Sequence, residues 1–385
     1  MLKGVAIGGG AVVLAGAAGI GVRGAVNGVW SQSRGAPYEL WQHWQDAEGT
    51  TRLVAAATLA ANPHNIQPWT FAVTDGTIDL YADPARIMPV NDSDGRERMA
   101  GFGCALENLA VAARVEGLTA TIAHVFDGDH VAHVDLAAGP LPSARERALA
   151  DAIANRHSNR GRYTAQPVDA ADLDALTADA LPEVSTGAEL VWITDPGAMA
   201  MIGDLYVEAT QAIVDDEEMS VESYTWFRND RADIDRHRDG LTLDCQGLDA
   251  FTLFAAKILP AQSRSDGDAF WVKATRTVHT ATAHAYGIVR VPSNTDPAAR
   301  LVGGRLLQHA HLAATASGLG LQHMNQVTER IARDASLGVP DRFGTRWADA
   351  VGIPTDEILL AVRVGHSERT PLPSPRRALT AVTAG

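Results

Sequence analysis

The stretch from Ala61 to Phe71 constrains the fold of this chain more than any other part of the sequence. Pro63 and Pro68 each fix their own φ angle and lack an amide donor, so a helix is not expected to continue through this stretch. A helical pattern over residues 40–61 precedes it, and an apolar strand pattern begins at Trp69. We therefore expect a rigid turn here that joins a helix to a strand.

The same turn carries three amide side chains, those of Asn62, Asn65 and Gln67, with His64 among them. An amide group offers both a hydrogen-bond donor and an acceptor. A flat heterocycle with alternating C=O and N–H groups, such as an isoalloxazine ring, is a ligand that uses such an edge. An ordinary helix-to-strand turn, with its aromatic residues in the core, explains the turn equally well when it is taken alone.

Two basic segments point to an anion. Residues 156–163 hold three arginines and Ser158 directly after an expected helix over residues 144–154. The planar donor fork of arginine suits phosphate oxygens, and a serine adds a short hydroxyl donor. A second basic pair, Arg376 and Arg377, follows an apolar strand near the C-terminus. Solvated basic turns are the alternative, but together the segments predict a ring-holding loop and two phosphate clamps.

These motifs resemble those of the nitroreductase-like FMN flavoproteins, and more closely the single-chain Acg family of FMN-binding oxidoreductases. The family's ring-contacting loop, P-x-x-N-x-Q-P-W, is matched by Pro63, Asn65, Gln67, Pro68 and Trp69. Its phosphate motif, R-[RH]-S-x-[RK], is matched by Arg156, His157, Ser158 and Arg160. A G-L-x-x-Q/C turn is matched within residues 318–326, and a closing basic pair by Arg376 and Arg377. The resemblance spans about residues 38–383.

The resemblance implies one bound FMN and transfer of a hydride or electrons through flavin N5 to an acceptor such as a nitroaromatic or a quinone. No catalytic side chain is then required, because the cofactor carries the chemistry. The phosphate would be held by Arg156, Ser158, Arg160 and one of Arg376 and Arg377. The ring edge would be bound by Asn65 with His64 or Gln67, and the turn at His323–Asn325 would present a backbone N–H to N5 or O4. The implied cofactor-binding residues are His64, Asn65, Gln67, Arg156, His157, Ser158, Arg160, His323, Met324, Asn325, Arg376 and Arg377.

The pattern of elements restarts near residue 144, which suggests two halves. The ring loop lies in the first half, over residues 38–143, and the arginine cluster lies in the second, over residues 144–385. In dimeric relatives each flavin lies between two subunits. We therefore expect a nitroreductase-like α+β fold of two fused halves, an internal pseudo-dimer with one flavin site. A permuted or unrelated tandem remains an alternative.

Local signals place the elements within this plan. Asp75-Gly76 predicts a hairpin turn between strands at 69–74 and 77–81. Asp92 and Asp94 precede a pattern that predicts a central core helix over residues 96–116. Other expected helices cover residues 144–154, 170–180, 196–215 and 301–317, and further strands flank residues 127–129 and cover 189–194 and 357–364.

Residues 216–270 interrupt the second half with a polar, strongly charged stretch that contains Trp226 and Phe227. A long insertion in a compact fold is usually functional or mobile. We expect a lid over the flavin, with an embellishment on the outer surface as the alternative. An ordered lid with either aromatic ring on the flavin would favour a second function, a non-catalytic protein that stores or sequesters FMN. A mobile lid would favour an enzyme.

The N-terminus carries an uncharged stretch, residues 4–22, between Lys3 and Arg23. Such a pattern is typical of a signal or membrane-anchor segment, so residues 1–30 are set apart from the folded domain. We expect export or membrane association, with the flavin domain outside the cytoplasm. A buried core helix and a cytoplasmic location are the alternatives.

Composition excludes several other functions. A net charge of −14 argues against nucleic acid as a partner, because that binding depends on phosphate neutralisation. Cys104 and Cys245 cannot form a disulfide framework, and we expect Cys104 to be a buried small hydrophobe. His309 and His311 would point about 200° apart on a helix, so no metal site is expected. The expected partners are a small-molecule electron donor and acceptor, for a monomer or a homodimer.

Overall fold

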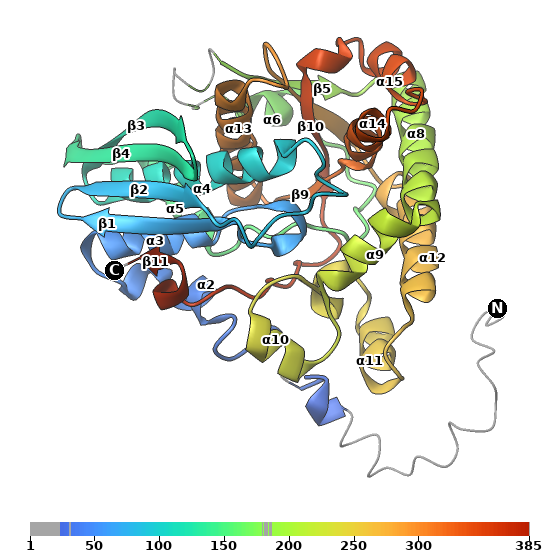
Figure 1. Ribbon diagram of the computed structural model, residues 1–385, viewed down its shortest axis with the longest axis horizontal. Coiled ribbons are helices and arrows are strands. Elements are labelled where there is room, and N and C mark those ends of the chain that lie inside the picture. The colour runs from blue at the N-terminus through green and yellow to red at the C-terminus, as the bar shows by residue number, and fades with distance from the viewer. Residues whose placement is uncertain (1–23, 31, 179, 181–183, 185–186, 385) are drawn as a thin grey trace.

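A computed structural model of the chain shows two α+β halves packed side by side (Figure 1). It describes residues 24–384 apart from residues 31, 179, 181–183 and 185–186. Residues 4–22 lie outside the described part, so their role as a signal or anchor stays a prediction. Among the residues that are described, none forms a helix long and apolar enough to span a bilayer.

The first half is built around a mixed sheet. Its helices are α2 (Glu39–His43), α3 (Gly49–Thr58) and α4 (Arg96–Val115), and its strands are β1 (Trp69–Thr74), β2 (Thr77–Ala82), β3 (Leu118–Asp127) and β4 (His130–Ala138). The predicted hairpin is confirmed, since Gly76 takes the left-handed φ of 84° that its turn requires. The single helix expected over residues 40–61 is wrong, because extended backbone at Ala47 and Glu48 separates α2 from α3.

The second half has a sheet of its own. Its main helices are α5 (Ala144–Ile153), α6 (Ala170–Ala175), α8 (Pro196–Asp215), α13 (Pro297–Ala316), α14 (Gln326–Leu337) and α15 (Gly344–Val351). Its strands are β5 (Glu189–Ile193), β8 (Ala285–Arg290), β9 (Leu319–His323) and β10 (Ile358–His366). The last short strand, β11 (Thr383–Ala384), crosses back and pairs in parallel with β1 of the first sheet. The end of the chain therefore completes the first half rather than the second.

The two halves share one connectivity. In the described part of the chain, the sheets have the orders β1-β2-β4-β3 and β5-β8-β10-β9, with β11 added at the edge of the first. In both sheets the first, second, fourth and third strands therefore lie in that order, and a long helix joins the second strand to the third. The expected α+β fold of two similar halves is confirmed.

Helices α4 and α13 meet at a close crossing whose contacts come in reciprocal pairs. A Cβ atom added to Gly103 would collide with the carbonyl oxygen of Leu301, and one added to Gly304 would collide with that of Ala100. Each glycine is the eighth residue of its helix, and each struck carbonyl lies three residues earlier in the partner helix. The crossing is thus self-complementary, as at an isologous dimer interface.

Polar side chains extend the same symmetry deeper into the crossing. His309 and Glu107 are bonded at 3.2 Å between Nδ1 and Oε1, and Gln308 donates to Asn108 at 2.6 Å. Counted from the first residue of each helix, these two pairs occupy exchanged positions. All four side chains are fully buried. These two buried hydrogen-bonded pairs therefore fix how the two halves are registered against each other.

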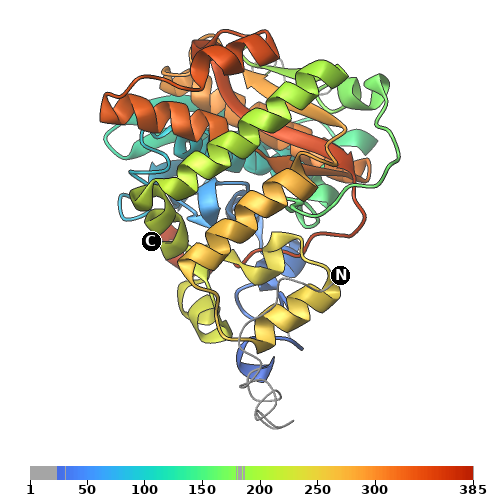
Figure 2. The same ribbon diagram turned by 90° about the vertical axis from the view of Figure 1, so that its right-hand side faces the viewer.

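The insertion lies between β5 and β8, where the first half has only a two-residue turn. After α8 it forms α9 (Glu217–Thr225), α10 (Arg231–His237), α11 (Ala250–Ile258) and α12 (Arg264–Ala274), with the short strands β6 (Phe227–Arg228) and β7 (Leu241–Thr242). In Figure 2 these helices, yellow-green to orange, gather on one side of the two sheets. The predicted lid segment is thus largely helical.

We expect Gly103→Ala and Gly304→Ala each to lower the free energy of unfolding by about 1–3 kcal/mol, the usual cost of overpacking. Backbone atoms stand in the way at both positions, so the new methyl group cannot be accommodated by a rotamer change. Urea unfolding measures the effect. Gly267→Ala on α12 is the matched control, because its Cβ would meet no atom within 4 Å and should stabilise the helix slightly. Equal behaviour of the three variants would contradict the close crossing.

Candidate functional site

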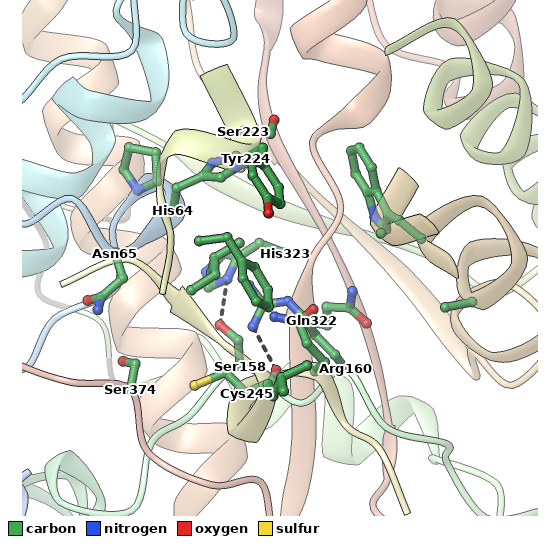
Figure 3. A pocket seen from close by; sticks show the side chains of 18 of the residues that line it. His64, Asn65, Ser158, Arg160, Ser223, Tyr224, Cys245, Gln322, His323 and Ser374 are labelled. Carbon is green, nitrogen blue, oxygen red and sulfur yellow. Dashed lines mark hydrogen bonds between the residues drawn. The ribbon is translucent and has the colours of Figure 1, made fainter. Parts of the chain in front are cut away.

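A cavity of about 440 Å³ lies where both halves, the insertion and the C-terminal segment converge (Figure 3). Nine of the twelve residues predicted to bind the cofactor line it: His64, Asn65, Arg156, His157, Ser158, Arg160, His323, Asn325 and Arg376. The three predicted motifs are far apart in the sequence, and the fold brings parts of all of them to one place.

The ring loop has a strained backbone. His64, Asn65 and Gln67 have φ values of 42°, 56° and 51°, in the left-handed region that favours glycine. Such conformations cost about 1–3 kcal/mol each and persist only where the surroundings fix them. One contact that fixes this backbone comes from the side chain of Asn62, whose Oδ1 accepts from the backbone N–H of Gln67 at 2.8 Å. The predicted rigid turn is confirmed, and His64 at its tip faces the cavity.

The amide of Asn65 is used within the protein. Its Nδ2 donates to the carbonyl oxygens of Gly240 and Pro375 at 3.0 and 2.9 Å, and its Oδ1 accepts from the guanidinium of Arg376. Although Asn65 borders the cavity, its hydrogen-bonding atoms are therefore occupied. Its place in the structure is to tie the ring loop to the insertion and to the C-terminal segment.

Two of the cavity arginines are deeply buried beside one aromatic ring. Arg156 and Arg376 are 2% and 3% exposed, and their guanidinium carbons lie 5.7 and 4.7 Å from the centre of the Trp41 ring. Both donate to the carbonyl oxygen of Leu59, at 3.0 and 3.3 Å. The Nε atom of each arginine is buried without a hydrogen-bond partner. Arg160 faces the same cavity and donates to the carbonyl oxygen of Cys245 at 3.2 Å (Figure 3).

None of these three arginines forms an ion pair with any carboxylate that the structure describes. Burial lowers the pKa of Arg156 to about 10, and it lowers the pKa values of Arg160 and Arg376 as well. A buried charge without a partner is costly, so buried charged groups are usually paired with a group of opposite charge. The cavity therefore contains uncompensated positive charge that a bound anion would neutralise.

The histidines of the site are neutral, chiefly because they are buried and also because of the nearby arginines. Burial, followed by the nearby arginines, lowers the pKa of His64 to about 4 and that of His323 to about 3. The same causes lower the pKa of His157 well below its usual value. His323 Nδ1 and the Ser158 hydroxyl are 3.3 Å apart (Figure 3), while His323 Nε2 and His157 Nδ1 have no partner. The neutral rings therefore offer hydrogen bonds rather than charge.

Three predicted residues do not line the cavity. The Gln67 amide donates to the Arg238 carbonyl oxygen at 2.9 Å and accepts from the backbone N–H of Arg377 at 2.8 Å. Arg377 pairs with Asp83 at 3.3 Å between Nη1 and Oδ2. Met324 is 1% exposed and belongs to the apolar core of the second half. These three side chains support the structure around the site, because they hold the loop or fill the core.

The insertion contributes much of the remaining wall. Tyr224, Phe227 and Trp271 line the cavity, whereas the Trp226 ring packs near the Arg228 guanidinium at 5.6 Å. The sequence pattern identified the segment but could not distinguish which of its two neighbouring aromatic rings faces the site. Cys104, which borders the cavity, is 2% exposed, and burial raises its pKa to about 12, so the expected buried hydrophobe is confirmed.

Sequence reasoning missed two acidic residues of the cavity wall. Glu97 lies in the first turn of α4 and Glu329 in the first turn of α14. Acidic residues at helix N-termini are common because they complement the helix dipole, so neither position stood out. Only their convergence in space makes them notable.

Comparison with known proteins gives the following similarities, and no family model matches the chain. A protein of Mycobacterium tuberculosis (strain H37Rv) named "Putative NAD(P)H nitroreductase" is 27% identical over 361 residues, which cover 90% of this chain and 94% of the relative. "Putative NAD(P)H nitroreductase acg" of the same organism is 28% identical over 154 residues, or 36% of this chain and 46% of that protein.

Solved structures give a weaker similarity. The FMN and NADPH-dependent nitroreductase NfnB from "sphigopyxis sp. strain HMH" is 16% identical, with a TM-score of 0.40, and covers 62% of this chain and 98% of its own. The FMN-dependent nitroreductase NfnB from Mycobacterium smegmatis is 14% identical, with a TM-score of 0.39 and the same coverages. The sequence relatives confirm the resemblance, to a putative NAD(P)H nitroreductase over 90% of the chain and to the acg protein over 36% of it.

Proposed function

We propose that this chain is an FMN-binding oxidoreductase that passes electrons from NAD(P)H to a small acceptor such as a nitroaromatic or a quinone. The observation that carries the proposal is the cluster of Arg156, Arg160 and Arg376 in one cavity, where none of the three forms an ion pair with a carboxylate among the described residues. A terminal phosphate supplies the missing negative charge, and the names of the mycobacterial relatives point to the same chemistry.

The residues present fit FMN. Its phosphate would be held by the three arginines with Ser158, all of which line the cavity. Arg156 and Arg376 each have a buried Nε without a hydrogen-bond partner. His64 and the fixed backbone of the ring loop would border the ring. The cavity volume of about 440 Å³ lies in the range typical of cofactor sites. When bound, the flavin supplies the hydride chemistry, and the protein orients it, excludes water and sets the local charge.

The purified protein should contain or take up one FMN per chain, and no FAD. The reason is that the arginine cluster suits a terminal phosphate, while the sequence has no dinucleotide fingerprint for an adenosine half. Cofactor extraction with mass analysis measures this, and addition of NADPH or NADH should bleach the flavin absorbance. Finding FAD, two equivalents of FMN, or no flavin binding on reconstitution would contradict the proposal.

A second function is favoured by one observation. Tyr224, Phe227 and Trp271 of the insertion line the cavity, so the segment is positioned to restrict access to a bound ring. This arrangement favours a protein that stores or sequesters FMN without turnover. The same experiment separates the two functions, because a sequestered flavin would remain oxidised after NADPH or NADH is added, although it would be reduced by dithionite.

A further inference from the structure

Two carboxyl groups from different halves of the protein meet at the cavity wall. Glu97 comes from α4 and Glu329 from α14, and their side chains are hydrogen-bonded to each other. A carboxylate can only accept hydrogen bonds, so two carboxyl groups can share one only if a proton stays between them. The pair is therefore a proton-holding site, as in other carboxyl dyads.

The surroundings keep that proton in place. Burial comes first among the causes that raise the pKa of Glu97 well above its usual value and that of Glu329 to about 7. The charged groups that act on the pair are Asp92, Glu222 and Arg330. Arg330 is engaged elsewhere, since it donates to Asp216 at 3.0 Å and pairs with Asp334. The nearby negative charge of Asp92 and Glu222 thus reinforces the effect of burial.

A third side chain in this part of the cavity wall has a polar atom available for a ligand. Gln326, the first residue of α14, lines the cavity and is only 4% exposed. Its Oε1 is buried without any hydrogen-bond partner, and buried amide oxygens are normally satisfied. Beside it, Asn325 bonds to Glu97 and also borders the cavity. An unpartnered acceptor next to a shared proton is a site for a polar group that can both donate and receive a proton.

We infer that the Glu97–Glu329 pair donates the proton that an acceptor takes up when it is reduced in this cavity. The inference rests on the proposed function, which supplies the electrons from NAD(P)H. For a quinone, one hydride brings two electrons and one proton, and the second proton comes from the pair. The O–H bond of the pair breaks as an O–H bond forms on the acceptor, which leaves as the hydroquinone. Water then returns one proton to the two carboxylates.

The test uses Glu97→Gln, Glu329→Gln and the double variant of the full chain, with Glu189→Gln as control. Glu189 lies on β5 with a side chain 65% exposed and does not line the cavity. In the ligand-free protein, the infrared band of a protonated carboxyl group at pH 7 should disappear in the pair variants. FMN content and the rate of flavin reduction by NADPH should be unchanged. Quinone reduction by the pre-reduced protein should slow by about 10²–10⁴-fold, the usual contribution of a general acid.

The pH dependence gives a second readout. In the unaltered protein, quinone reduction should fall as pH rises through the range in which the pair gives up its shared proton, and this break should vanish in the double variant. FMN binding with unchanged rates and pH profile in the pair variants would overturn the donor role alone. An absence of FMN binding in the unaltered protein would overturn both this role and the proposed function.

The carboxyl pair should also make the free energy of unfolding depend on pH. Because the pKa of Glu329 rises from 4.5 to about 7 on folding, the folded protein holds a proton that the unfolded chain releases. The free energy of unfolding should therefore be highest below pH 4.5, as far as this group is concerned, and decline as pH rises through 7. Urea unfolding between pH 5 and 8 should show this decline flattened in the double variant but not in Glu189→Gln. Parallel curves for all proteins would contradict the shared proton.

Discussion

Replacing Arg156 and Arg160 together by methionine should weaken FMN binding by about two to four orders of magnitude. Each charge-assisted hydrogen bond is worth about 1.5–3 kcal/mol, so the loss of two gives about 3–6 kcal/mol, at about 1.4 kcal/mol per tenfold change in Kd. Methionine keeps most of the side-chain volume, so packing near Trp41 is preserved. Fluorescence titration of the ligand-free protein with FMN measures the change.

The matched control is Arg162→Met, in the same turn of the chain. Arg162 is exposed and donates to the Thr277 carbonyl oxygen at 3.2 Å rather than facing the cavity. It should leave FMN affinity nearly unchanged. Because the cavity arginines have no carboxylate partner in the part of the chain described, the ligand-free double variant should unfold at no lower urea concentration than the unaltered protein. A loss of affinity below threefold, or an equal loss in the control, would place the phosphate elsewhere.

Replacing Glu107 by alanine should lower the free energy of unfolding by about 3–5 kcal/mol, because it removes one partner of a buried ion pair. Glu107 on α4 is fully buried, and its Oε2 accepts from Arg305 Nη2 on α13 at 3.0 Å. Urea unfolding measures the loss. Glu116→Ala, just after the end of α4, is the control, since its surface pair with Arg52 should contribute only about 0–1 kcal/mol. Similar losses in both variants would contradict a central role for the buried pair.

The pH dependence of this pair has the opposite sign to that of Glu97 and Glu329. Burial tends to raise the pKa of Glu107, but Arg305 and His309 outweigh it and hold the pKa down to about 2. The stabilisation is therefore complete above the usual value of 4.5 and is lost as pH falls toward 2. Acid unfolding of the unaltered protein should show this loss, and Glu107→Ala should show less of it.

Elements with strong local signals could be predicted from the sequence. The Asp75-Gly76 turn fixes its hairpin because only a few residue types adopt left-handed backbone at low cost. Helix α4 begins where expected, with Asp92 accepting from the backbone N–H groups of residues 97 and 98 at 2.9 and 2.8 Å. Helix α6 is shorter than expected, ending at Ala175. Helix ends are decided by packing as much as by sequence.

The candidate site was predicted by residue type but not by role. Arginine and serine in one turn, and amides beside prolines, mark segments that bind polar ligands, and nine of the twelve residues do line the cavity. Residue type does not predict which polar atoms remain available to a ligand. The Asn65 amide and the Gln67 amide are consumed by contacts to residues more than a hundred positions away, and no local pattern indicates such contacts.

The sequence by itself determined the halves, the rigid turn, the basic clusters and the resemblance, because each depends on residues close together in the chain. Only the tertiary structure decided that β11 returns to the first sheet, that Phe227 rather than Trp226 lines the cavity, and that Glu97 meets Glu329. These outcomes depend on where separate elements meet. The free energy of a buried charge or amide is set by all of its neighbours at once, and those neighbours come from distant parts of the chain.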